Sequence, residues 1–244
     1  MPITPPSPTP GHAGLFVAFE GGDGAGKSTQ AGLLRSALEA IGREVVLTRE
    51  PGGTELGAAI RQVLLHGDHV APRAEALLFA ADRAHHVATV VRPALDRGAV
   101  VLTDRYLDSS IAYQGQARAL SQDDIRDISL WATEGLLPDL TVLLDVSAGE
   151  GRSRRAGVHD RLEREADAFH EAVREGFLLL AEREPGRYLV LDAATEPVVL
   201  HQAVCRELAT RHPGLSALVP VGDERAPRPA CRSRAADPAG GEAS

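Results

Sequence analysis

The amino-acid sequence predicts an α/β fold in three layers, with a five-stranded parallel sheet between two layers of helices. Five short apolar runs alternate with longer segments of helical periodicity, and the runs are apolar throughout rather than at every second residue. Such strands are buried on both faces, as in parallel sheets covered by helices. A glycine-rich segment, residues 21–28, joins the first run to the first helical segment and supports the same class.

Each element is predicted from its own stretch of sequence. The predicted strands are residues 15–20, 44–48, 99–104, 140–146 and 188–193. The predicted helices are residues 27–41, 55–65, 73–92, 121–134, 162–184 and 196–211. In the first helix the apolar residues recur every three or four positions and form one stripe. Ser121 precedes two aspartates, and this pattern is typical of a helix N-cap.

Both ends of the chain are rich in proline. Residues 1–13 contain five prolines, and residues 213–244 contain five more. Segments of this composition bury too little apolar surface to offset the entropy lost on ordering. We therefore expect disordered tails at 1–13 and 213–244, and one domain over residues 14–212.

The charge balance excludes some classes of function. The chain has 26 basic and 34 acidic residues, a formal net charge of -8, which argues against a broad basic face for nucleic acid. No apolar run approaches the roughly 18 residues of a membrane span, and the N-terminus lacks the pattern of a secretory signal. The 2 cysteines show no CxxC spacing. We expect a cytoplasmic protein without membrane or nucleic-acid partners.

The glycine-rich segment fits the pattern G-x-x-x-x-G-K-[ST] between a strand and a helix. This context is typical of P-loop NTPase-type folds, in which backbone N–H groups and a helix N-terminus hold phosphate. Lys27, the one lysine among the basic residues, is expected to reach the β- and γ-phosphates, and Ser28 to ligate Mg²⁺. The predicted ATP-binding residues are Gly21, Gly22, Asp23, Gly24, Ala25, Gly26, Lys27, Ser28 and Thr29.

Three further segments are expected near the same edge of the sheet. Residues 49–54 follow the second predicted strand, and ligands of parallel sheets bind beyond the carboxyl ends of the strands. Phe79 and Arg83 lie four residues apart and share one face of a helix, which suits a base and its phosphate. At the end of the third strand, Arg105 can bridge two phosphates and Asp104 can hold Mg²⁺ through water.

Taken together, these segments resemble the thymidylate kinase family. The resemblance rests on FEGGDGAGKSTQ, TREPGGT, LLFAADR, DRYLDSSIAYQG and DRLE, in this order, and covers residues 15–211. It implies phosphorylation of dTMP to dTDP by ATP, a requirement for Mg²⁺, a mobile lid over about residues 148–161, and a homodimer that packs helices such as 73–92.

The resemblance also implies roles for individual residues. Phe79 matches the position that stacks on thymine, and Tyr113 matches a tyrosine that crowds the 2′ position of the sugar. Arg83 and Arg105 match positions that bind the dTMP phosphate and its surroundings, and Asp23 one near the 3′-hydroxyl. The full predicted substrate set is Asp23, Glu50, Gly53, Thr54, Phe79, Arg83, Arg105, Ser109, Ser110, Tyr113 and Gln114.

The lid is the expected source of a catalytic arginine. One branch of the family carries an arginine within the phosphate loop, whereas this sequence has Gly24 and Ala25 there. The segment after the fourth strand is arginine-rich between flanking glycines, so this sequence resembles the bacterial, lid-arginine type. Arg155 or Arg161 is expected to contact the phosphates on closure, and Arg161, inside DRLE, is the better-placed motif match. The predicted catalytic residues are Lys27, Arg105, Arg155 and Arg161, with Ser28 and Asp104 at the metal.

Other interpretations differ in what they require. A kinase for dUMP or a deoxynucleoside shares the phosphate loop, although the Arg83 and Arg105 pair favours an acceptor that already carries phosphate. A GTP-binding switch needs an N-K-x-D segment, and the chain has no second lysine to form it. A regulatory ATP-binding module would lack transfer activity.

Trp131 is expected in the core, and His66, His69, His85 and His86 are expected to be solvated or partly buried.

Overall fold

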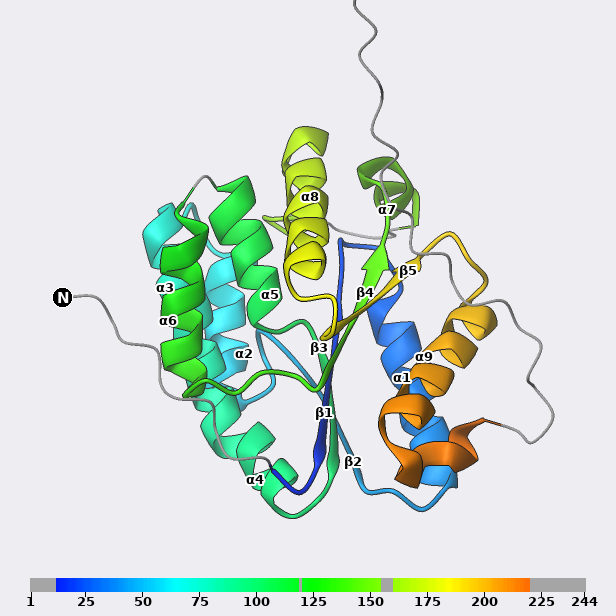
Figure 1. Ribbon diagram of the computed structural model, residues 1–244. Coiled ribbons are helices and arrows are strands. Elements are labelled where there is room, and N and C mark those ends of the chain that lie inside the picture. Colours follow the sequence, from blue (N-terminus) through cyan, green and yellow to red (C-terminus); the bar gives the residue numbers. More distant parts are fainter. Residues whose placement is uncertain (1–11, 119, 155–159, 220–244) are drawn as a thin grey trace, which may run out of the picture.

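The computed structural model describes residues 12–118, 120–154 and 160–219. Its centre is a sheet of five parallel strands in the order β2-β3-β1-β4-β5 (Figure 1). The strands are β1 (Leu15–Glu20), β2 (Val45–Arg49), β3 (Val100–Asp104), β4 (Leu140–Asp145) and β5 (Tyr188–Asp192). The predicted fold class and all five predicted strands are confirmed, with ends shifted by at most one residue.

Helices connect the strands and cover both faces of the sheet. The α-helices are α1 (Lys27–Ala40), α2 (Glu55–Arg61), α3 (Pro72–His86), α4 (Arg92–Asp96), α5 (Leu107–Ser110), α6 (Gln122–Thr133), α7 (Ala148–Arg154), α8 (Asp167–Arg183) and α9 (Pro197–Arg211). Turns of π-helix follow three of them, η1 (Gln62–His66), η2 (Val87–Val91) and η3 (Ile111–Ala117), and a 3-10 helix, η4 (Pro213–Leu218), follows α9.

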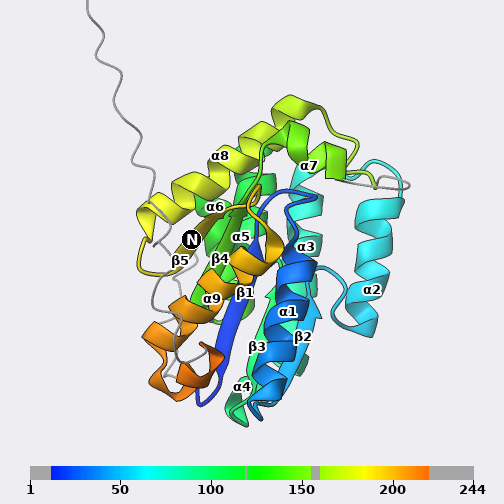
Figure 2. The ribbon, with the colours of Figure 1, turned by 90° about the vertical axis from the view of Figure 1, so that its right-hand side faces the viewer.

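Side chains of β1 point alternately to the two faces of the sheet, so the core has two parts. Phe16 and Ala18 point to the face covered by α3, α6 and α8, whereas Leu15, Val17 and Phe19 point to the face covered by α1 and α9. Figures 1 and 2 both show α1 and α9 side by side on one face, with the larger group of helices opposite. Burying a β1 side chain on either face contributes about 1.5–3 kcal/mol.

The edge strands differ from the sequence expectation. Residues of β1, β3 and β4 are almost all buried, but β2 and β5 are only partly buried, and Leu47 and Val190 are about 40% exposed. An apolar run therefore does not by itself distinguish a central strand from an edge strand, since both are rich in the same residue types.

Several helical predictions need correction. The predicted helix over 162–184 begins at Asp167, because residues 161–165 form turns. A helical segment predicted by no pattern, α5 with η3, follows β3 directly. Ser121 caps α6 as predicted, with its Oγ accepting from Asp124 N at 3.2 Å. Trp131 on α6 is 62% exposed, so its expected place in the core is wrong.

The C-terminal boundary also lies later than expected. Residues 213–218 form η4, and Leu215 and Leu218 are buried against the α1 and α9 side of the core. The packed body therefore extends past residue 212, while residues 1–11 and 220–244 of the two expected tails lie outside the described residues. In the part of the chain that the structure describes, no helix combines the length and apolar character needed to span a bilayer.

Candidate active site

The phosphate loop turns through three glycines with positive φ, Gly21 at 133°, Gly24 at 81° and Gly26 at 93°. Such angles strain any residue with a Cβ, so glycine is what lets the backbone curl between β1 and α1. Lys27 lies over the loop, and its Nζ donates to Gly21 O at 3.1 Å and to Gly22 O at 2.8 Å. Burial and the nearby Arg105 charge lower the pKa of Lys27. The loop thus holds its lysine in place ready for phosphate.

An oxygen pair lies at the start of α1, beside the end of β3. Ser28 Oγ donates to Asp104 Oδ2 at 2.5 Å. Among the described residues, no three His, Cys, Asp or Glu side chains cluster as a metal site. This small oxygen set fits Mg²⁺, which proteins hold through one or two oxygen ligands while phosphates and water complete the octahedron.

Asp23, Arg105 and Tyr113 form a charged triangle between the loop and the acceptor side. Arg105 Nη2 donates to Asp23 and, at 3.1 Å, to the Tyr113 hydroxyl, which donates to Asp23 Oδ2 at 3.0 Å. Burial opposes ionisation of Asp23, but the charges of Arg105 and Lys27 outweigh it and hold its pKa below the usual range. Burial raises the pKa of Tyr113, so its hydroxyl keeps its proton and donates.

Arg105 adopts an unusual backbone conformation that aims it at this triangle. Its φ is 70°, which costs a residue with a Cβ about 1–3 kcal/mol. The flanking hydrogen bonds overcome this cost: Arg105 N donates to Phe19 O at 2.9 Å, and Tyr106 N to Glu20 Oε1 at 2.8 Å. The strained residue lies at the end of β3, and its conformation turns the Arg105 guanidinium towards the phosphate loop.

A second buried cluster surrounds Glu50. Its carboxylate accepts from Arg83 Nε at 2.8 Å and lies 2.8 Å from His86 Nδ1. His86, expected to be solvated or partly buried, is fully buried and also lies 2.7 Å from Thr48 Oγ1. Arg83 is 1% exposed and donates to Ser110 Oγ at 3.0 Å. Its partners are not those of Arg105, so the two arginines are held separately.

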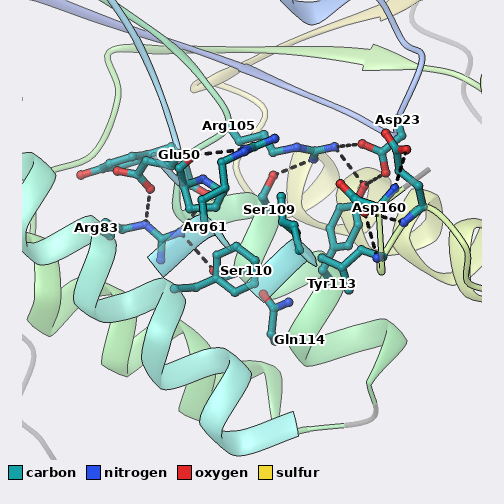
Figure 3. A pocket seen from close by; sticks show the side chains of 16 residues that line it. Asp23, Glu50, Arg61, Arg83, Arg105, Ser109, Ser110, Tyr113, Gln114 and Asp160 are labelled. Atoms are coloured by element: carbon teal, nitrogen blue, oxygen red, sulfur yellow. Dashed lines mark hydrogen bonds and ion pairs between the residues drawn. The ribbon is translucent and has the colours of Figure 1, made fainter. Parts of the chain in front are cut away.

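One cavity joins these parts (Figure 3). Nine predicted substrate residues line it: Asp23, Glu50, Phe79, Arg83, Arg105, Ser109, Ser110, Tyr113 and Gln114. The predicted Gly53 and Thr54 do not line it. Thr54 caps α2, with its Oγ1 accepting from Gly57 N at 2.9 Å. A Cβ on Gly53 would lie 2.6 Å from Thr48 Oγ1, so that position shapes the wall from behind.

Residues missed by the sequence analysis complete the cavity. Arg61, at the end of α2, lines it and donates through Nη1 to Pro51 O at 3.0 Å. Burial and the charge of Arg49 lower the pKa of Arg61. No spacing in the sequence indicates this position, since Thr54, the nearest predicted site residue, does not itself line the cavity. Asp160, at the end of the expected lid, and Leu162 and Glu163, just after it, also line the cavity.

The two lid arginines expected at the phosphates have different outcomes. Arg155 lies outside the described residues. Arg161 does not contact the phosphate loop: its Nη2 donates to Glu75, and its Nε to Leu64 O at 2.9 Å. In this structure the buried carboxylate of Glu75 holds the guanidinium away from the phosphate loop, and the contact expected on closure stays a prediction.

Helix α7, within the segment expected to form a lid, lies directly on the phosphate loop. A Cβ at Gly24 would lie 2.3 Å from Gly151 O, and a Cβ at Gly151 would lie 2.5 Å from Asp23 O. Real side chains do not tolerate such distances, so both positions need glycine while the two backbones touch. This contact explains physically why the loop carries no arginine at position 24.

Comparisons with known proteins agree with this geometry. The family model described as "Thymidylate kinase" matches residues 19–204. A thymidylate kinase of Clavibacter michiganensis subsp. michiganensis (strain NCPPB 382) is 64% identical over 185 residues, 74% of this chain and 88% of the relative. One of Bifidobacterium longum (strain NCC 2705) is 58% identical over 186 residues, 74% and 90% of the two chains. A crystal structure of thymidylate kinase from Ehrlichia chaffeensis has a TM-score of 0.68 and 32% identity, and the match covers 82% of this chain and 99% of that one.

Proposed function

The chain belongs to the thymidylate kinase family and phosphorylates dTMP to dTDP with ATP, and from this premise we propose how its residues divide the work. The observation that supports the division is the single cavity that runs from Asp23 of the phosphate loop to Phe79, Arg83 and Gln114. The phosphate loop meets this cavity at Asp23, and the rest of the lining suits the acceptor.

The donor end takes ATP. Backbone N–H groups of residues 21–26 and the N-terminus of α1 bind the β- and γ-phosphates, and Lys27 leaves the loop carbonyls to reach them. Ser28 and Asp104 would hold Mg²⁺, and Thr29 belongs to the ATP-binding residues at the start of α1. When bound, the ion neutralises charge on the β- and γ-phosphates.

The acceptor end takes dTMP. Phe79 stacks on the thymine ring, and Ser110, Gln114 and Arg83 face the polar edge of the base. Tyr113 crowds the 2′ position of the sugar and so favours deoxyribose. Gly53 and Thr54 shape the wall, and Glu50 and Ser109 fix the arginines: Glu50 accepts from Arg83 at 2.8 Å, and Ser109 Oγ accepts from Arg105 at 3.1 Å.

Arg105 and Arg61 bind the acceptor phosphate and place one of its oxygens in line with the γ-phosphorus. That oxygen forms the new P–O bond while the bond to the β-phosphate bridging oxygen breaks, and ADP leaves with that electron pair. No covalent intermediate on the enzyme is required, since positioning and charge compensation are sufficient. Asp23 keeps Arg105 oriented until phosphate arrives, as their ion pair indicates.

The lid-arginine assignment is part of the proposal. With Arg161 engaged by Glu75, Arg155 is the stronger of the two expected candidates for the transferring phosphoryl group. Alanine at 155 should lower kcat by about 10³-fold or more, whereas alanine at 161 should mainly raise the KM for dTMP. Equal losses of kcat in the two variants would contradict this division.

We further infer a cytoplasmic homodimer with one kinase domain per chain, closed by the lid. Two large apolar side chains, Leu77 on α3 and Trp131 on α6, are 55% and 62% exposed on helices that pack together. Exposed apolar groups of this size are typical of interfaces. Sedimentation velocity should give a dimer, and Trp131→Arg should shift it towards monomer; a monomeric wild type would reject the dimer.

The acceptor panel tests the site assignment. ADP release should be fastest with dTMP, slower with dUMP, weak with the ribose analogue, and absent with thymidine, which offers Arg105 and Arg61 no phosphate. Chelation by EDTA should abolish turnover and added Mg²⁺ restore it, and Asp104→Asn should raise the Mg²⁺ concentration for half-maximal rate. Turnover of thymidine as fast as dTMP would remove the phosphate role of these arginines.

A further inference from the structure

Glu75 is a fully buried carboxylate that neither the motifs nor the proposed mechanism uses. It lies on α3 behind the cavity wall, with 0% of its surface exposed. Three side chains from two other parts of the chain donate to it. They are Gln114 through Nε2 at 3.0 Å, Arg118 through Nε at 3.5 Å, and Arg161 through Nη2.

Two guanidinium groups compensate this buried charge. Arg161 is anchored further by Leu64 O, and Arg118 pairs with Glu165 at 2.7 Å and lies 4.8 Å from the Phe169 ring centroid. A carboxylate without such partners would cost several kcal/mol to bury. Because both arginines have second anchors, Glu75 is held in one orientation, with its remaining Oε1 contact directed to Gln114.

This contact fixes which way the Gln114 amide points. A carboxylate accepts hydrogen bonds and donates none, so only the NH₂ group of Gln114 can face Glu75. The carbonyl oxygen Oε1 is then on the other side of the amide. Gln114 lines the cavity, and in Figure 3 its amide points into it. Among the described residues, nothing donates to this oxygen.

A fixed carbonyl at this place distinguishes pyrimidines by the atom at N3. Thymine and uracil carry a hydrogen there, which a carbonyl oxygen accepts. Cytosine carries a lone pair there, so two acceptors would face each other without a proton between them. Arg83, beside Ser110, offers only donors, which suit O4 of thymine but not the 4-amino group of cytosine.

We propose that Glu75 is a positioning residue for base selection, which holds Gln114 with its carbonyl towards N3–H and so rejects cytosine nucleotides. The inference rests on the proposed placement of the acceptor base at Gln114. It deepens that function by assigning the rejection to a residue that never touches substrate. An amide free to rotate would satisfy either base, so selection requires the fixed partner.

The test compares dTMP with dCMP as acceptors. Glu75→Gln keeps the shape but can donate or accept, so Gln114 can turn over. The ratio of kcat/KM for dTMP to that for dCMP should fall about 10- to 100-fold, the range for one buried polar contact. The KM for ATP should stay within about twofold. Glu165→Gln removes a carboxylate from the same Arg118 without touching Gln114, and should leave the ratio unchanged.

A double-variant comparison separates positioning from a general loss of packing. Gln114→Leu removes the amide and should lower the ratio by a similar factor. Adding Glu75→Gln to Gln114→Leu should lower it no further, because Glu75 then has no amide to hold. A ratio that falls again in the double variant, or that stays unchanged in Glu75→Gln, overturns the proposal.

Two outcomes are distinguished by design. If Glu75→Gln folds poorly, the ratio of kcat/KM for dTMP to that for dCMP in Gln114→Leu decides the proposal. An unchanged ratio in that variant would show that the Gln114 amide, which Glu75 is proposed to hold, does not select the base. Failure of wild type to prefer dTMP over dCMP would instead contradict the base placement in the proposed function. Calorimetric binding of both nucleotides gives the same ratio for any variant too slow to assay.

Discussion

The two ends of the cavity are built in opposite ways. The phosphate loop is six consecutive residues, and its shape is set by glycines with positive φ and by lysine bonds to its own carbonyls. The acceptor end is assembled from side chains of segments that lie far apart in sequence, from Glu50 to Glu163. Its charges are buried in pairs, such as Glu50 with Arg83 and Glu75 with Arg161.

Because of this difference, the donor end should mainly set the rate of transfer and the acceptor end the choice of substrate. A loop that presents backbone N–H groups binds any nucleoside triphosphate and contributes mainly to the transition state. Buried side chains held by second partners present a fixed pattern of donors and acceptors, which one substrate matches and others do not. Changes at the donor end should therefore lower kcat, and changes at the acceptor end should raise KM or alter the choice of substrate.

Lys27→Ala should have the largest effect and lie wholly on the donor side. We expect kcat to fall about 10³-fold, which corresponds to about 4 kcal/mol, because the positive charge that Lys27 places beside the transferring phosphoryl group is lost. The KM for dTMP should change less than about threefold, as measured by steady-state ADP release. A large rise in that KM with kcat retained would break the separation between the two ends.

Glu20 lies where the two ends meet, and it should make stability depend on pH. It is fully buried on β1 and accepts from Ser109 Oγ at 2.6 Å on the acceptor side. Burial and the nearby Asp108 raise the pKa of Glu20 to about 7 from 4.5. The folded state binds this proton more tightly than the unfolded state. The contribution of Glu20 to the free energy of unfolding is therefore complete below pH 4.5, and about 3 kcal/mol of it is lost as the pH rises to 7.

Glu20→Gln should remove this slope, since its amide does not titrate. Urea unfolding at pH 5, 6 and 7 measures the free energy of unfolding for both proteins. Wild type should lose stability relative to Glu20→Gln across this range. If the free energies of unfolding of the two proteins change in parallel from pH 5 to pH 7, Glu20 does not titrate in this range.

Gly24→Ala should disturb the donor end through its backbone alone. The φ of 81° strains alanine, and its Cβ would overlap Gly151 O, so loop and α7 must separate. We expect about 2–3 kcal/mol less stability and about 10²-fold lower kcat, followed by urea unfolding and ADP release. Gly32→Ala on α1 is the matched control, because nothing lies within 4 Å of its new Cβ. Equal effects of the two changes would refute the contact.

Arg83→Lys should have the smallest effect and lie on the acceptor side. Lysine keeps the charge but cannot bond Glu50, Ser110, Ser129 and the Tyr106 carbonyl together, as Arg83 does. The KM for dTMP should rise about 10- to 30-fold, near 2 kcal/mol, with kcat within a few-fold of wild type. An ATP KM that rises equally would indicate that the change spreads to the donor end.

The same contrast decides how much could be predicted from the sequence. The phosphate loop and its Ser28 and Asp104 neighbours follow from local pattern, because the residues that matter are adjacent or end neighbouring strands. The spacing of Phe79 and Arg83 suits a base and its phosphate, but only the family resemblance assigns Phe79 to thymine and Tyr113 to the sugar. Glu75 and Arg161 could not be paired beforehand, because their contact depends on how the segment after the lid folds back.

Errors in the fold have a related cause. Trp131 is apolar and sits on a helix, so pattern alone places it inside, but a face that covers the core and one available to another chain look alike in a single sequence. The α5 and η3 segment was missed because Glu20, far away in sequence, accepts the N–H groups that begin it. Leu215 and Leu218 order η4 through only two apolar contacts within a proline-containing stretch.

The touching backbones at Gly24 and Gly151 restrict the evolutionary routes open to this enzyme. A single mutation to arginine at 24 would supply a cation near the phosphates and at the same moment displace α7. Arginine at 24 would require the loop and α7 to separate first, because the positive φ and the close backbone of Gly151 both oppose any Cβ there. This backbone contact therefore decides which side chains the loop can carry at position 24, and it keeps glycine at both 24 and 151.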